Sequence, residues 1–134
     1  LAGDPNVAAA IAKLEGQAGG EAQNGAIDLL EKGNLNAALE KIKHAMQYLE
    51  AAEAANPALD VGYTKGLLAL TAKSIAVDTI AQAEAVATKP NELRKIQQAR
   101  DLVAQGDMLL VALDHVGAVD KYQQAVREVQ GIPH

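Results

Sequence analysis

The clearest helical hairpin in the sequence spans residues 26–57, which read AIDLLEKGNLNAALEKIKHAMQYLEAAEAANP. Gly33 suits the left-handed position that ends a helix, and Asn34 suits the N-cap of the next one. After this turn, apolar residues recur at spacings of four, three, four and three, at Leu35, Leu39, Ile42, Met46 and Leu49. This spacing predicts an amphipathic helix that ends at Asn56, because a proline follows it.

A looser copy of the pattern occupies residues 98–126, which read QARDLVAQGDMLLVALDHVGAVDKYQQAV. Gly106-Asp107 stands where the first copy has Gly33-Asn34, so we expect a turn there. The last helix would then carry an apolar line of Leu109, Leu113, Val116, Val119, Tyr122, Val126 and Val129. If Gly106 does not break the chain, the last two helices fuse into one.

Three further segments are predicted to be helical: residues 5–32, residues 61–88, and a helix that Lys89-Pro90-Asn91 begins. Four glycines between positions 16 and 25 predict either a loop or close contact with another helix or chain. Residues 66–81, GLLALTAKSIAVDTIA, are apolar almost all round, so we expect neighbours on two sides of this helix. The helix that begins at Lys89-Pro90-Asn91 has an apolar face of Leu93, Ile96, Ala99 and Val103.

No segment shows the alternation of a β-strand. The sequence therefore predicts an all-α fold: a single domain of residues 1–134, forming an antiparallel four- or five-helix bundle built from helical hairpins.

Charge and composition disfavour or exclude several classes of partner and of binding site. The 134-residue chain carries a net charge of −5, which disfavours nucleic acid as a partner, and its aromatic share of 2% leaves few platforms for stacking bases. It contains no Cys, which excludes disulfides and thiolate metal sites. No stretch approaches the roughly 20 apolar residues of a membrane span. Leu1 in place of an initial Met favours an exported, periplasmic or extracellular protein, although a trimmed chain would look the same.

The region that begins with residues 26–57 resembles two known families. Gly33, Leu35, Ala38, Leu39, Ile42, Ala45 and Met46 fall where tetratricopeptide repeats place small and apolar residues. The fixed period of about 34 residues is missing, so the likeness is one of hairpin consensus and not of a repeat array. Residues 43–68, KHAMQYLEAAEAANPALDVGYTKGLL, also resemble the small metal-binding protein family over roughly 30–68. That resemblance implies an exported helical protein whose metal-binding role would be carried over only at His44.

The strongest candidate metal ligands are Glu40 and His44, four residues apart on one helix face, which with a third ligand could hold a divalent metal. The alternative is an ordinary surface pair. His115 is either a partly exposed polar residue or a ligand, for example a haem ligand with Met46 or Met108. His134, the last residue, is uninformative alone.

Nothing points to catalysis. Ser74 is the only Ser and lies among apolar residues, phosphate-loop motifs are absent, and the carboxylates are scattered. The three tyrosines, Tyr48, Tyr63 and Tyr122, are either interface anchors or rim residues of the core. We expect a non-enzymatic structural or interaction protein that associates through helix faces with a protein partner or with itself. The alternative is a carrier of a small ligand or divalent metal.

Overall fold

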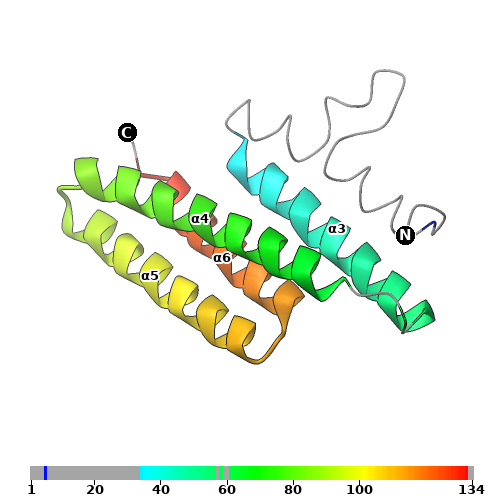
Figure 1. The fold of residues 1–134 in the computed structure, drawn as a ribbon. Helices are drawn as coiled ribbons and strands as arrows, with labels where there is room; N and C mark the ends of the chain where they lie inside the picture. Colours follow the sequence, from blue (N-terminus) through cyan, green and yellow to red (C-terminus); the bar gives the residue numbers. More distant parts are fainter. Residues whose placement is uncertain (1–4, 6–33, 57, 59–60, 133–134) are drawn as a thin grey trace, which may run out of the picture. The chain divides into compact units, whose positions relative to one another are not determined.

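In the computed structural model, the described residues are 5, 34–56, 58 and 61–132. They form four helices, α3 (Leu35–Ala55), α4 (Gly62–Val86), α5 (Pro90–Val111) and α6 (His115–Gln130) (Figure 1). All the regular structure of these residues is helical, which confirms the predicted all-α class of packed helical hairpins and agrees with the predicted bundle. The predicted helix over residues 5–32 lies almost wholly outside the described residues, and its glycines lie wholly outside them.

The chain divides into two compact units, residues 1–68 and residues 69–134. The prediction of a single domain over residues 1–134 stays a prediction. None of the described helices is both long and apolar enough to cross a membrane.

In the first unit, α3 begins as the sequence predicts. The Asn34 side chain accepts a hydrogen bond from the backbone N–H of Ala37 at 3.4 Å, which satisfies one free donor of the first turn. The apolar residues that were predicted to form one face of this helix are buried from Leu39 to Leu49, and Leu35 is partly exposed. A small core cluster joins this helix to the start of the next one, through Ala45, Leu49, Ala52 and Val61 with Leu68 packed against it.

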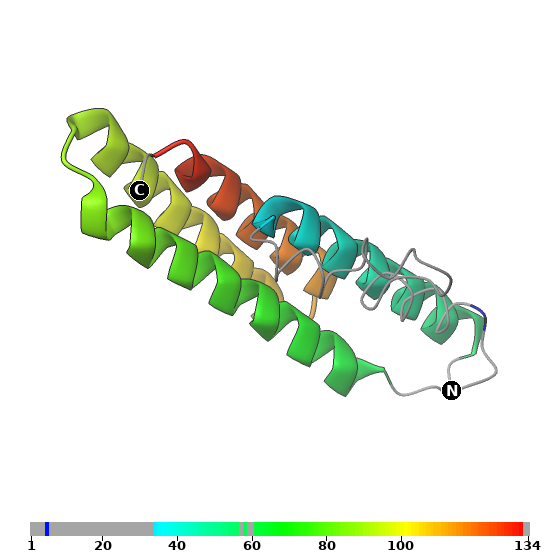
Figure 2. The same cartoon turned by 90° about the horizontal axis from the view of Figure 1, so that it is seen from above.

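The second unit holds the rest of α4 together with α5 and α6. The α5 and α6 helices pack side by side in opposite directions (Figure 2). Pro90 is in the first turn of α5, as predicted, and the Glu92 carboxylate accepts the backbone N–H groups of Lys89 at 3.1 Å and Thr88 at 3.2 Å. These bonds hold the pKa of Glu92 below its ordinary value. The core of α6 is its buried face of Ala118, Val119, Tyr122, Gln123, Ala125, Val126 and Val129.

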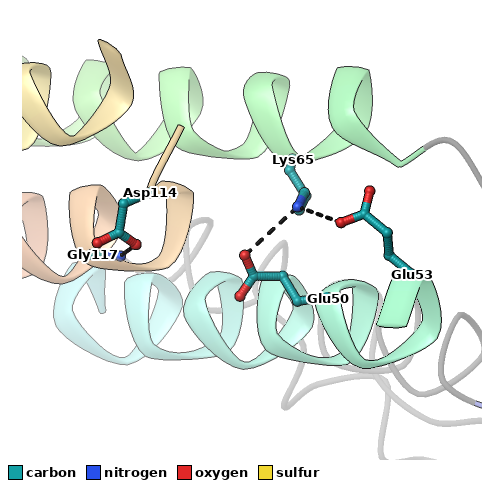
Figure 3. A network of polar contacts seen from close by, with 5 residues as sticks. All are labelled: Glu50, Glu53, Lys65, Asp114 and Gly117. Carbon is teal, nitrogen blue, oxygen red and sulfur yellow. Dashed lines mark hydrogen bonds and ion pairs between the residues drawn. The ribbon is translucent and has the colours of Figure 1, made fainter. Parts of the chain in front are cut away.

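The predicted turn at Gly106-Asp107 is wrong. Both residues lie inside α5, and the chain turns later, at residues 112–114. Gly106 has a packing role instead, because a Cβ atom there would stand 2.6 Å from Cε1 of the Tyr122 ring. The end of α5 comes where Asp114 can cap the next helix: its Oδ1 accepts the backbone N–H of Gly117 at 3.0 Å (Figure 3). The fourth and fifth predicted helices therefore exist, but Leu109 belongs to the earlier one and Leu113 to the turn.

Candidate functional site

The α4 helix distributes its side chains in an unusual way. Within the second unit its fully buried positions are alanines, Ala69, Ala72, Ala76 and Ala83, at spacings that place them on one face. Small side chains on this face let a neighbouring helix approach closely. Thr79 and Ile80 are also buried, at 3% and 5% exposure, so Ile80 is the one large apolar side chain that this part of α4 buries among its described residues.

Of the larger apolar residues of α4 in this unit, Ile80 is buried and Ile75 is partly exposed, whereas Leu70 and Val77 point outward. Leu70 is 56% exposed and Val77 is 44% exposed, and Ser74 and Ala81 lie on the same line at spacings of four, three and four. We call these four residues the α4 stripe. Folding normally buries such side chains, because each fully buried Leu or Val stabilises a protein by about 1.5–3 kcal/mol. Exposed apolar side chains that form a contiguous patch mark interaction surfaces.

The prediction of neighbours on both sides of α4 captured the apolar excess but not its direction. In the described residues of the second unit, one face is buried and the opposite one is exposed. The signal available in the sequence was the recurrence of alanine at helical spacing, at Ala69, Ala72, Ala76 and Ala83. In the first unit, Tyr63 and Leu67 on the same helix are also exposed.

A shallow groove of about 200 Å³ adjoins the stripe. Val77, Ile80 and Ala81 line it from α4 and Val103 lines it from α5. Glu84 and Arg100 also line it, and their side chains, both about half exposed, form an ion pair between the two helices. The groove thus has apolar walls and a charged pair within reach of a bound group. It is large enough for one aliphatic side chain, since a cavity of about 150 Å³ holds benzene.

A second group of exposed apolar residues surrounds the α5–α6 turn. Met108 is 73% exposed, Val111 86% and Leu113 74%. We call these three residues the apolar tip. The sequence pattern placed Leu113 on a buried line, and the structure corrects this because the turn removes it from α6.

The turn itself is strained at Leu113. Its N–H donates to the carbonyl of Leu110 at 2.9 Å, and the N–H of Asp114 donates to the carbonyl of Leu109 at 2.8 Å. This Schellman arrangement needs a left-handed residue between the two helices, usually Gly, and here Leu113 supplies it with a φ of 65°. A leucine in that conformation costs about 1 kcal/mol.

Two polar clusters hold helices together. Tyr122 is fully buried, and its hydroxyl donates to Oδ1 of Asp107 at 2.6 Å, while Lys73 Nζ lies 3.2 Å from the same oxygen. Burial, together with the Asp107 carboxylate, raises the pKa of Tyr122. Of the three tyrosines, this one is therefore a core residue with a satisfied hydroxyl, whereas Tyr48 and Tyr63 are exposed.

The other cluster lies in the first unit. The nearly buried Lys65 places its Nζ 3.0 Å from Oε1 of Glu53 and 3.6 Å from Oε2 of Glu50 (Figure 3). Two carboxylates compensate the desolvation of one ammonium group, and the pairs tie α4 to α3. This arrangement stabilises the hairpin and leaves the lysine little room to reach another molecule.

The predicted metal ligands do lie together. His44 Nε2 is 2.9 Å from Oε1 of Glu40, and Lys43 Nζ is 3.4 Å from Oε2 of the same carboxylate. All three belong to α3, and within the described part of the chain no group of three or more His, Asp or Glu residues is arranged to hold a metal ion. The metal site at Glu40 and His44 stays a prediction.

The other two histidines, His115 and His134, give no further support for a metal or haem site. His115 begins α6, and its Nδ1 is buried without a hydrogen-bond partner. Met108, one of the two methionines considered with it, is largely exposed, and Met46 is fully buried. The haem alternative stays a prediction, and His134 lies outside the described residues.

Comparison with known proteins gives no family. No protein-family model, no curated protein and no solved structure matches this chain. The resemblances to tetratricopeptide hairpins and to the small metal-binding protein family therefore remain expectations from sequence.

Proposed function

We propose that this chain is a non-enzymatic structural or interaction protein that binds a protein partner, or a copy of itself, through the α4 stripe and the adjoining groove. The observation that carries the proposal is the division of α4 into a buried alanine face and an exposed face with Leu70 and Val77. Burial of these two half-exposed side chains against a partner would contribute about 1 kcal/mol each.

The charges around the groove fit a protein partner. The Glu84–Arg100 pair offers a carboxylate acceptor and a guanidinium with five N–H donors beside an apolar surface. Protein interfaces combine an apolar centre with such polar edges. Export stays a prediction from sequence alone.

Site-specific photo-crosslinking tests the proposal. A photoreactive phenylalanine analogue replaces Val77 in one variant and Gln98, an exposed polar position on α5, in a control. Both full-length variants are irradiated under two conditions: as purified proteins, and after addition to an extract of the native source. Crosslinks from position 77 with none from position 98 support the proposal. Equal labelling from both positions, or none from position 77, refutes it.

A further inference from the structure

The second unit carries both a protruding apolar group and an apolar hollow. The apolar tip of Met108, Val111 and Leu113 is exposed at the end of α5, and the groove lies farther back, between α4 and α5. Val103 and Val111 are eight residues apart on one helix, which is about 12 Å. A chain cannot fold its own tip back into its own groove over that distance without unwinding α5.

We propose that the groove of one chain receives the apolar tip of a second copy, with Leu113 as the inserted side chain. This inference rests on the proposed function, since it names the partner of the same surface. Leu113 is the best candidate for two reasons. Its side chain is exposed, and its backbone holds the left-handed φ of 65° that glycine would adopt more easily, so the turn itself does not favour a leucine.

The Arg100 guanidinium in the groove is complementary in charge to Asp114 beside the tip. Asp114 directly follows Leu113 and is exposed, so insertion of the leucine brings a carboxylate towards the groove, where Arg100 is half exposed. Arginine has enough N–H donors to keep its bond to Glu84 and to donate to a second carboxylate. The carboxylate of Asp114 retains free lone pairs for this contact while it caps α6 through Gly117.

The geometry of the contact fixes the kind of assembly. A tip that enters a different surface on the next copy makes a heterologous contact, which repeats from chain to chain and forms rings or open filaments. The surface is small: three side chains and a groove bury less than the roughly 1,000 Å² of a stable specific interface. The association is therefore weak and becomes visible at high micromolar concentration or above.

The test is a complementation experiment with full-length chains. Leu113→Gly removes the tip side chain but keeps the groove, and Ala81→Lys blocks the groove but keeps the tip. Ala54→Lys, at an exposed position on α3, is the matched control for the added lysine. Native mass is followed by light scattering and sedimentation across concentration, and circular dichroism and thermal melting check each fold.

We expect the wild type and Ala54→Lys to associate with rising concentration, and each of the other two variants to associate at least tenfold more weakly. An equimolar mixture of Leu113→Gly and Ala81→Lys should form a one-to-one dimer and nothing larger, because only one tip and one groove remain. Leu113→Gly should also melt at a higher temperature than the wild type, which shows that its loss of association is not a loss of fold.

The inference is overturned if Leu113→Gly associates like the wild type, or if the mixture stays monomeric while the wild type assembles. It is also overturned if the wild type is monomeric throughout while position 77 crosslinks to a different protein. That last result leaves the proposed function standing and identifies another occupant of the groove.

Discussion

Replacement of Gly106 by alanine probes the packing that the sequence pattern missed. Two effects oppose each other. Alanine favours a helix over glycine by about 1 kcal/mol. However, the new Cβ would stand 2.6 Å from Cε1, 2.9 Å from Cζ and 3.0 Å from Cδ1 of the Tyr122 ring. Carbon atoms in contact normally lie about 3.5–4.0 Å apart, so the ring has to move by about 1 Å.

The ring has little freedom to move. Tyr122 is completely buried, and its hydroxyl is held at 2.6 Å from Asp107. Overpacking of a core costs about 1–3 kcal/mol, and a hydrogen bond to a charged group is worth about 1.5–3 kcal/mol. Even if that bond is only weakened, the loss exceeds the gain in helix propensity. We expect Gly106→Ala to lower the free energy of unfolding by about 1–3 kcal/mol.

Gly66→Ala is the matched control. Gly66 lies inside α4, and a Cβ there would meet no atom within 4 Å. This variant should gain about 0.5–1 kcal/mol. Urea unfolding followed by far-UV circular dichroism measures both changes. The same Gly106→Ala change in a Tyr122→Leu background should lose most of its cost, because the smaller side chain leaves room for the Cβ. If Gly106→Ala is as stable as the wild type in the Tyr122 background, the close contact between Gly106 and Tyr122 does not exist.

Three further predictions concern single residues. Leu113→Gly should raise the free energy of unfolding by about 1 kcal/mol, because the left-handed φ is relieved, and Leu113→Ala should show no such gain in urea unfolding. Glu92 has a folded-state pKa below its ordinary 4.5, since backbone N–H groups of Lys89 and Thr88 bind its carboxylate. Its stabilisation is thus complete above the unfolded-state pKa and lost as the pH falls through the folded-state pKa. Glu92→Gln should reduce this acid loss in denaturation curves measured below about pH 4.5. His44→Ala should cost at most about 0.5 kcal/mol as an exposed helix pair. The metal alternative instead predicts a heat of zinc binding that this variant abolishes in calorimetry, and equal heats for the two proteins remove it.

Helix starts were predictable because their chemistry is local. Asn34 caps α3 and Pro90 begins α5 through groups that lie within a few residues of each other in the chain. The buried line from Leu39 to Leu49 was predictable for the same reason, since its period is that of one helix. The structure confirms these features.

Gly106 shows where local reasoning fails. A glycine after an apolar run signals either a helix end or a close contact, and the sequence does not distinguish them. The deciding partner, Tyr122, lies on the next helix and is brought there by tertiary packing. The real turn rests on Leu113, a residue type that carries no turn signal, and its one local marker was the N-cap at Asp114.

The candidate surface was predictable in part. The apolar excess of residues 66–81 indicated that α4 would use more than one face, and the three-dimensional arrangement was needed to assign alanines to the core and Leu70 and Val77 to the outside. The groove and the apolar tip were not predictable, because each joins residues from α5 with a neighbouring element.

Sedimentation equilibrium of the wild type and of Val77→Asp, over the same range of concentrations, tests whether the groove between α4 and α5 binds another chain. Val77 is partly exposed and lines the groove, so a carboxylate there should leave the circular dichroism spectrum unchanged and disfavour apolar contact. We expect the wild-type mass to rise above 13.9 kDa with concentration and the variant to stay at this monomer mass. A wild type that remains at 13.9 kDa throughout, and that gives no crosslinks from position 77, would contradict the proposed function.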